Sequence, residues 1–336
     1  MKWLENVKLA EITTMRLGGA AKHVAEVRTE EDVREAYRWA REHGKQVFIV
    51  GGGSNLIGAD EPYDGLIILN RIVDGGTEDN GVFTVPSGVV MDDFIRDVVD
   101  AGWSGMEAMA KIPGTIGAAP VQNAGAYGQE IKDTLVGVRC YDSYTDEFVE
   151  IPTLELDFAY RHSIFNSGDE PFRYFIVSVT VKLHKGQMEP PFYNSLQAYL
   201  DEHNITDYTP RAIFDAVSAV RAVKLPDPAV EPSAGSFFKN IQVSDGEAAG
   251  LREKGVMVWD QSDGGRNVVS SGWLIENAGL KGREFNGFQV SDKAALILIN
   301  RSAFSYADLV KARAAIVDAV REKYGIVMEQ EPVEIR

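Results

Sequence analysis

The sequence predicts an α+β protein of two or three domains. The chain has 336 residues, which exceeds the usual size of one domain. Short runs with strand periodicity are mixed with amphipathic helical runs along its length. Near Asn70 the pattern changes from an α/β unit to short strands joined by glycine- and proline-rich segments. These observations together indicate several packed units of mixed α and β structure.

The first 70 residues are predicted to form a small α/β unit. A helix is expected from Thr29, which can cap it, to Gly44, which can end it. Its apolar face is formed by Val33, Ala36, Tyr37 and Ala40. A buried strand, "QVFIV", runs directly into the glycine turn "GGGSN", and "GLIIL" is the second strand.

The middle of the chain is predicted to be α+β. The strand "VFTVP" and a helix over residues 87–101 precede a long glycine- and proline-rich loop, residues 112–128. The strands "LVGVRCYD", "EFVEIP" and "YFIVSVTVKL" follow, and then an irregular excursion over 184–208. Thr209 and Pro210 begin a further helix, and "KLPDP" ends it. The apolar face of this helix is Ile213, Phe214, Val217 and Val220.

The last part of the chain is predicted to contain the strand "AALILIN" and a strong helix from Ser305 to Tyr324, which stops before Gly325. The acidic residues along 245–265 are expected to be solvated loop. The tail "MEQEPVEIR" is, on its simplest interpretation, an exposed acidic segment.

Composition disfavours several classes of function. The formal net charge of −16 disfavours nonspecific binding to nucleic acid, and a site for an anionic substrate must be locally basic. No apolar run is long enough to span a membrane and no signal-peptide core is present, so no membrane insertion is expected. The single cysteine, Cys140, allows no internal disulfide and fits a reducing compartment such as the cytoplasm. A monomer is expected, although nothing in the composition determines the oligomeric state. The five histidines show no metal-ligand spacing, which predicts no metal site.

Two glycine-rich segments are candidates for a phosphate-bearing cofactor. "VGGGSN", residues 50–55, follows a strand and can turn backbone N–H groups toward an anion, but it matches neither a Walker A loop nor G-x-G-x-x-G. "IPGTIGAAPVQNAGAYG" is apolar for a solvated linker, which favours backbone packed against something flat. A tight turn and a buried structural loop are the alternative interpretations.

Two further segments carry candidate polar chemistry. In "YRHSIF", residues 160–165, Arg161 offers a bidentate fork for a carboxylate or phosphate. In "SAGSFFKN", residues 233–240, Ser236 has no evident activating base. It can act as an acid toward a carbanion if cations such as Lys239, Lys224 or Arg161 stabilise the alkoxide. A surface arginine and a small turn residue are the alternatives.

Taken in order, these segments resemble the UDP-N-acetylenolpyruvoylglucosamine reductase (MurB) family. The resemblance runs from about Thr13 to Glu331 and rests on the two glycine loops, "YRHSIF", "KLPDP", "AGSFFKN", "GWLIENAGLKG" and a C-terminal glutamate pair. It implies a three-domain FAD-binding α+β fold of the vanillyl-alcohol-oxidase kind. The implied domains are 1–69 and 70–226 for FAD and 227–325 for substrate, with the tail 326–336 returning near the first.

The resemblance implies noncovalent FAD, with NADPH as co-substrate. The implied reaction is the reduction of UDP-N-acetylglucosamine enolpyruvate to UDP-N-acetylmuramate in peptidoglycan synthesis. Ser236 matches the proton donor, and Arg161 and Glu331 match the two residues that assist it. Substrate-contacting positions are matched by Tyr160, Tyr193, Lys224 and Asn240. The FAD site is matched by Gly51, Gly52, Gly53, Ser54, Asn55, Pro113, Gly114, Thr115, Gly117, Ala118, Gln122, Asn123, Gly125 and Ala126.

The chain departs from the family pattern at three places. His162 stands where the family usually has aspartate, and "GFQVSDKAALIL" lacks the usual histidine and glutamine. The third departure is that the sequence stops five residues after Glu331. Separately, the first glycine loop holds no histidine or cysteine, so a covalent flavin bond is not expected. Two alternatives stay open: an oxidase of the same fold acting on an alcohol or hydroxy acid, and a non-catalytic relative that binds UDP-sugars.

Overall fold

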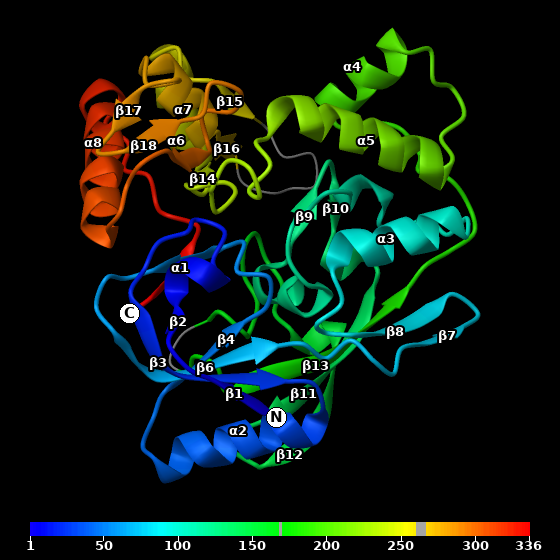
Figure 1. Cartoon of the computed structure of the whole chain (residues 1–336). Coiled ribbons are helices and arrows are strands. Elements are labelled where there is room, and N and C mark those ends of the chain that lie inside the picture. Colours follow the sequence, from blue (N-terminus) through cyan, green and yellow to red (C-terminus); the bar gives the residue numbers. More distant parts are fainter. Residues whose placement is uncertain (168–169, 260–266) are drawn as a thin grey trace. The chain divides into compact units, whose positions relative to one another are not determined.

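The computed structural model describes residues 1–167, 170–259 and 267–336 (Figure 1). The chain forms two compact units, each built from segments that are not continuous in sequence. Unit 1 comprises Met1–Val7, Ala21–Gly52 and Asp64–Ala222. Unit 2 comprises Lys8–Ala20, Gly53–Tyr63 and Val223–Arg336. The three-domain division expected from the sequence stays a prediction.

The first sheet of unit 1 has the strand order β1-β3-β6-β4, and β2 (Val7–Lys8) also pairs with β3. Its strands are β1 (Lys2–Leu4), β3 (Ala20–Val27), β4 (Val47–Val50) and β6 (Tyr63–Asn70). Helix α2 (Glu30–Glu42) lies along this sheet (Figure 1). The four apolar residues predicted for its face are all buried, and Thr29 caps it by accepting a hydrogen bond from the N–H of Asp32. The helix prediction is therefore confirmed.

The second sheet of unit 1 is antiparallel, with the order β12-β11-β13-β8-β7. Its strands are β7 (Thr77–Asp79), β8 (Val82–Pro86), β11 (Leu135–Asp142), β12 (Glu147–Pro152) and β13 (Tyr174–Lys182). Both faces are covered by apolar side chains. One face packs against α2 through Tyr141 and Phe175, and the other contributes Val138 and Val179 to the larger core of unit 1.

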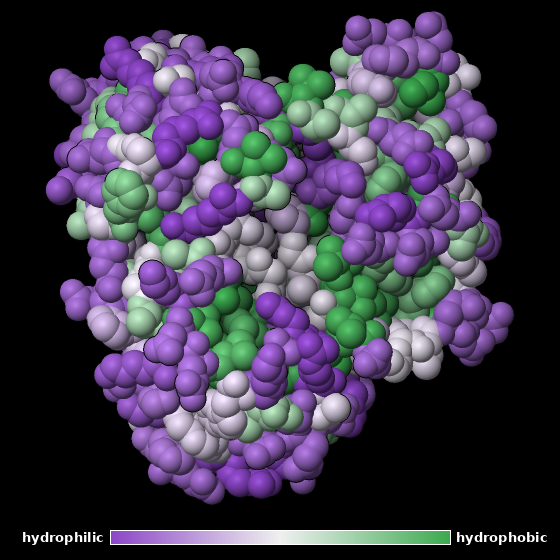
Figure 2. All heavy atoms as spheres, in the orientation of Figure 1, coloured by the Kyte–Doolittle hydropathy of each residue, from purple (hydrophilic) through white to green (hydrophobic). Residues whose placement is uncertain are grey.

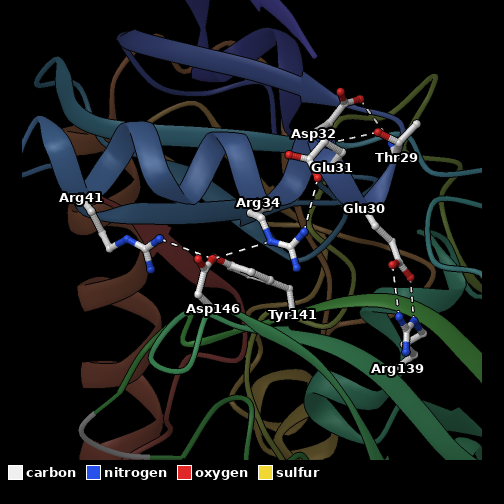
Figure 3. A network of polar contacts seen from close by, with 9 residues as sticks. All are labelled: Thr29, Glu30, Glu31, Asp32, Arg34, Arg41, Arg139, Tyr141 and Asp146. Atoms are coloured by element: carbon white, nitrogen blue, oxygen red, sulfur yellow. Dashed lines mark hydrogen bonds and ion pairs between the residues drawn. The ribbon is translucent and has the colours of Figure 1, made fainter.

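Polar contacts join α2 to the hairpin between β11 and β12 (Figure 3). Arg139 donates to the Glu30 carboxylate at 2.6 Å, and Arg41 donates to Asp146 at 3.5 Å. Tyr141 also donates to Asp146. The four charged side chains are 35–47% exposed, so each ion pair contributes little to stability, whereas Tyr141 is buried.

The larger core of unit 1 is covered by helices and by the long glycine loop. The helices are α3 (Met91–Asp100), α4 (Asn194–Glu202) and α5 (Pro210–Lys224). The short elements are η1 (Glu107–Met109), η2 (Ile116–Ala118), η3 (Pro120–Gln122), β9 (Gly125–Ala126), β10 (Gln129–Glu130), η4 (Ile131–Asp133) and η5 (Thr153–Glu155). The predicted apolar face of α5 is buried, as expected.

Unit 2 is held together by one apolar core that includes α8 (Tyr306–Tyr324). Ser305 caps this helix and Gly325 ends it at φ +73°, as predicted. The other elements are α1 (Leu9–Ile12), β5 (Leu56–Gly58), β14 (Ile241–Val243), α6 (Asp245–Glu253), β15 (Val258–Trp259), β16 (Asn267–Val269), α7 (Ser271–Asn277), β17 (Glu284–Phe285), β18 (Phe288–Val290), β19 (Leu298–Asn300) and β20 (Val333–Ile335).

Two expectations for unit 2 were wrong. Residues 245–253 form α6 instead of a solvated loop, because Ser244 and Glu247 build a capping box at its start. Part of that predicted loop, residues 260–266, lies outside the described residues. The acidic tail is not simply exposed, since β20 pairs in parallel with β5.

Hydrophilic side chains cover the outer surface around α8 and around α4 and α5 on the face drawn in Figure 2. Among the described residues, no helix has the length and apolar character that crossing a membrane requires.

Candidate active site

The first glycine loop connects β4 to β5. A side chain at Gly51 would place its Cβ 2.6 Å from the Thr115 hydroxyl, and one at Gly52 would lie 2.8 Å from the Cα of Gly114. The contact at Gly52 is with backbone and leaves no room for a Cβ atom, whereas at Gly51 the Thr115 side chain would have to move. The two glycine loops of the sequence therefore meet backbone to backbone within unit 1.

The second glycine loop leaves a buried polar atom next to this contact. Thr115 is 7% exposed, and its Oγ1 has no hydrogen-bond partner among the described residues. A buried hydroxyl without a partner costs free energy, which a hydrogen-bonding ligand can recover. The close approach of two glycine loops beside an unsatisfied hydroxyl fits a dinucleotide cofactor such as FAD. Pro113, Gly114, Gly117, Ala118, Gln122, Gly125 and Ala126 lie in the same loop.

The remaining residues of the first glycine loop belong to unit 2. Gly53 has φ +69°, and a Cβ there would lie 2.0 Å from the carbonyl oxygen of Ile12. Its own carbonyl accepts a hydrogen bond from the N–H of Thr14 at 3.1 Å. Ser54 follows it, and the carbonyl of Asn55 accepts a 2.9 Å bond from the N–H of Val333. The C-terminal tail is thus joined to the end of this loop.

Tyr160 and Arg161 lie in a loop that is tied to the second glycine loop. Ser163 donates to the carbonyl of Val121 at 2.7 Å, and Asn123 donates to that of Ala159 at 3.4 Å. Arg161 has φ +54°, an unusual backbone for a residue with a side chain, and its guanidinium lies 5.2 Å from the Tyr160 ring centroid. Strain of this kind is concentrated at functional sites.

The excursion over 184–208 places Tyr193 at the N-terminus of α4. Tyr193 is 60% exposed, and its ring meets that of Tyr127 edge-on with centroids 5.6 Å apart. Burial raises the pKa of Tyr127, with a further contribution from Tyr193 that nearby Arg221 opposes. The two tyrosines join the excursion to the second glycine loop.

Arg221 is a candidate that the sequence reasoning missed. It lies on α5 next to Tyr127, and burial lowers the pKa of its guanidinium. It donates to the carbonyl of Lys111 at 3.2 Å, but its buried Nε has no hydrogen-bond partner among the described residues. The spacing R-x-x-K before "LPDP" puts Arg221 one turn before the exposed Lys224, which is the signal that could have identified it.

Ser236 is held by backbone pairing within unit 2. Gly235, at φ +70°, precedes it, and Ser236 pairs with Ile297 in an isolated antiparallel bridge. The next residue, Phe237, donates its N–H to the carbonyl of Leu296 at 2.8 Å. Because Phe237 and Phe238 are buried in the core, the half-buried hydroxyl of Ser236 is carried on a rigid segment.

The same segment pairs with the C-terminal tail. The N–H of Glu331 donates to the carbonyl of Phe237 at 3.0 Å, and the N–H of Lys239 donates to that of Glu329 at 2.9 Å. Asn240 accepts a hydrogen bond from the N–H of Ser271 at 3.2 Å. Hydrogen bonds therefore connect the segment that carries Ser236 and Asn240 to the tail that carries Glu331, although the two segments are far apart in sequence.

His162 contacts a carboxylate of its own loop. The His162 ring lies 3.4 Å from the Asp157 carboxylate, within its own loop. Within residues 1–167, 170–259 and 267–336, no group of three or more His, Cys, Asp or Glu side chains is arranged to hold a metal ion.

Two family models match the chain. The model described as FAD binding domain matches residues 21–151. The model for the C-terminal domain of UDP-N-acetylenolpyruvoylglucosamine reductase matches residues 227–335.

Curated relatives match over almost the whole length. The chain is 38% identical over 336 residues to UDP-N-acetylenolpyruvoylglucosamine reductase from Ralstonia nicotianae, with 97% of each chain covered. It is 33% identical over 338 residues to the enzyme of that name from Pseudomonas putida, covering 99% of this chain and 98% of the relative.

Solved structures support the fold. A crystal structure of UDP-N-acetylenolpyruvylglucosamine reductase (MurB) from Thermus caldophilus matches with a TM-score of 0.70 at 24% identity, covering 99% of both chains. The 6-hydroxy-D-nicotine oxidase from Arthrobacter nicotinovorans matches with a TM-score of 0.53 at 14% identity, covering 96% of this chain and 84% of the other. The predicted α+β FAD-binding fold is confirmed.

Proposed function

Because the chain belongs to the UDP-N-acetylenolpyruvoylglucosamine reductase family, we propose that Ser236 supplies the proton of the family's reaction. The chain is an FAD-dependent oxidoreductase. It reduces the enolpyruvyl group of UDP-N-acetylglucosamine enolpyruvate in peptidoglycan precursor synthesis. When bound, FAD would supply the hydride for the terminal enolpyruvyl carbon, and the two glycine loops would hold it.

NADPH is proposed to reduce the flavin first. NADP⁺ then leaves before the enolpyruvyl substrate is reduced. The C=C bond of the substrate gains one hydride and one proton and becomes the lactyl ether of UDP-N-acetylmuramate. After hydride addition, negative charge develops on the neighbouring carbon and toward the carboxylate. Ser236 then gives its proton to that carbon and is left as an alkoxide until solvent returns a proton.

Arg161 and Glu331 are proposed to bind the substrate carboxylate. Arginine pairs with a carboxylate through two parallel N–H donors, which stabilises the charge that grows during the reaction. Tyr160, Tyr193, Lys224 and Asn240 are proposed to contact the rest of the substrate.

Arg221 is proposed to bind an anionic group of the cofactor or of the substrate. A half-buried guanidinium whose Nε lacks a partner among the described residues is costly unless a ligand pairs with it. In a chain with a net charge of −16, such a cation gives the site a locally basic character.

FAD is proposed to be held noncovalently by Gly51–Asn55 and by residues 113–126 of the second loop. The observation that supports this is the unsatisfied Thr115 hydroxyl beside Gly51. The chain is proposed to act as a cytoplasmic monomer, without nucleic-acid binding or membrane insertion; its net charge supports the absence of nucleic-acid binding. The three-domain organisation, with boundaries near residues 70 and 227, is part of this proposal.

The proposed function is tested on the purified protein in two steps. Acid precipitation should release all the flavin into the supernatant, and anaerobic addition of NADPH should bleach the flavin absorption. Addition of the enolpyruvyl substrate should then restore the absorption and yield UDP-N-acetylmuramate. Flavin that stays with the pellet, or reduced flavin that reacts with oxygen and not with the substrate, would contradict the proposal and favour an oxidase.

A further inference from the structure

The C-terminal tail around Glu331 is fixed by a polar cluster of four side chains, which we call the tail clamp: Tyr306, Arg313, Gln330 and Glu334. Arg313 lies on α8, and one nitrogen, Nη1, donates to Gln330 at 2.6 Å and to Glu334 at 2.8 Å. Glu334 also interacts with Tyr306, at the start of the same helix. The clamp therefore binds the tail at Gln330 and at Glu334, one on each side of Glu331.

The side chain of Gln330 forms a hydrogen bond across Glu331. Its Nε2 donates to the carbonyl of Pro332 at 2.8 Å, so one side chain spans the residue between them. The same Nε2 lies 3.3 Å from Glu334. With the N–H of Glu331 bonded to the carbonyl of Phe237, the backbone of Glu331 is held by its neighbours on both sides.

The clamp is more than an exposed ion pair. The side chains of Arg313 and Glu334 are 28% and 12% exposed, whereas Arg321 and Asp318 on the same helix are 59% and 61% exposed. Helix α8 is itself anchored, because the N–H of Tyr306 donates to Asp60 at 2.7 Å. Asp60 follows β5, the strand that pairs with β20. The tail is thus attached to one rigid helix and one strand.

We propose that Arg313 and Glu334 are positioning residues for Glu331, and that the tail clamp sets the place of its carboxyl group in the reaction. This inference rests on the proposed role of Glu331. Neither residue touches the reacting atoms under this proposal. They act by fixing a backbone segment on which a displacement of about 1 Å can change the rate by about 100-fold.

The test uses the full-length FAD-loaded enzyme and compares its two half-reactions. Arg313→Met should slow reoxidation of the reduced flavin by the enolpyruvyl substrate by about 10- to 100-fold. Reduction of the flavin by NADPH should stay within about twofold, because that step does not use the substrate carboxylate. Arg313→Lys should restore part of the rate, since a single nitrogen makes both contacts and an ammonium offers three donors.

A double-mutant cycle separates this proposal from the role of Glu331 itself. In a Glu331→Gln background, Arg313→Met should have almost no further effect if it acts through Glu331. Fully additive effects would overturn the clamp while leaving the role of Glu331 intact. A Glu331→Gln enzyme with normal reoxidation would overturn the proposed role of Glu331 instead, and the clamp with it.

One further variant addresses a possible loss of folding, and another serves as a control. Glu334→Gln keeps the shape of the side chain and should reproduce the selective slowing if Arg313→Met does not fold. Arg321→Met is the matched control, because it removes an exposed arginine from the same helix. An equal loss in both half-reactions for Glu334→Gln, or a normal rate, would overturn the proposal.

Discussion

Glu331 donates its backbone N–H to the carbonyl oxygen of Phe237 at 3.0 Å, directly beside Ser236 in the chain. The two residues are 94 positions apart in sequence, and one hydrogen bond makes their segments neighbours. If Ser236 is the proton donor and the Glu331 carboxyl group assists it, as proposed, both are best carried on segments whose backbones are bonded to each other. The hydrogen bond between Glu331 and Phe237 connects the two segments in this way within unit 2.

Ser236→Ala should separate the two half-reactions. Flavin binding and reduction by NADPH should remain almost intact, while reoxidation by the enolpyruvyl substrate should fall by about 10²–10⁴-fold, the usual contribution of a positioned acid. Ser236→Cys should recover part of the rate, because a thiol can also donate a proton. Stopped-flow absorption of the flavin measures both steps. Near-normal reoxidation in Ser236→Ala would exclude Ser236 as the acid.

Gly52→Ala should disturb the meeting of the two glycine loops. The new Cβ would lie 2.8 Å from the backbone of Gly114, so we expect a loss of about 1–3 kcal/mol in stability and weaker FAD binding. Flavin content and thermal unfolding measure these effects. Gly250→Ala in α6 is the control: nothing lies within 4 Å of its Cβ, and it should stabilise the protein by about 0.5–1 kcal/mol. Equal behaviour of the two variants would contradict the loop contact.

Arg221→Met should weaken the binding of one anionic ligand selectively. It keeps an apolar stem of similar length and removes the charge that lacks a partner at Nε. Titration of the apoprotein with FAD and of the holoenzyme with substrate shows which ligand is affected, and a loss of about tenfold or more is expected for a charged contact. Tight binding of both ligands would show that Arg221 is structural.

Tyr193→Phe tests whether the excursion over 184–208 closes on the substrate. The ring contact with Tyr127 is kept and only the hydroxyl is lost. Substrate binding should weaken by about five- to tenfold, the effect of one hydrogen bond, while flavin reduction by NADPH should not change. Equal effects on the two half-reactions would count against a lid.

Glu334 should make the stability of the protein depend on pH. Burial raises the pKa of its carboxyl group, but hydrogen bonds from Tyr306, Arg313 and Gln330 outweigh burial and lower the pKa below its ordinary value. A folded-state pKa below the unfolded one stabilises the protein above the unfolded pKa, and this contribution is lost as the pH falls through the folded value. Urea unfolding should therefore show Glu334→Gln less stable by about 1 kcal/mol at pH 7, with the difference vanishing in acid. A difference in stability that persists in acid would show that the charge of Glu334 is not its cause.

The sequence predicts the helices well because their signals are local. Thr29 and Ser305 are caps and Gly325 is a left-handed stop, and each can be recognised from a few neighbouring residues. Strand β5 was not predicted, since three residues carry no periodicity and its partner β20 lies at the other end of the chain. Pairing between strands so far apart in sequence cannot be predicted from a short stretch of neighbouring residues.

The site could be predicted only in part, for a similar reason. The glycine loops can be recognised from their composition, whereas Ser236 and Glu331 were identified only through the resemblance to the family, and their roles stay predictions. Arg221 was not predicted because what makes it a candidate, a buried Nε without a partner among the described residues, is a property of the packing. Arg313 was missed because the contacts of its guanidinium lie in the tail, 17 and 21 residues further along the chain.

The discontinuous construction of unit 2 sets the order in which the chain can mature during its synthesis. Met15, Leu17 and Ile57 belong to the same core as Leu309 and Ile316, so the early segments emerge from the ribosome long before their partners exist. Until then these apolar side chains need shielding, and β5 is an edge without its neighbour β20. We therefore expect unit 2 to acquire protease resistance only when the last residues are released. A fragment that starts at residue 227 should fail to acquire that resistance, although a family model matches that stretch as a separate domain.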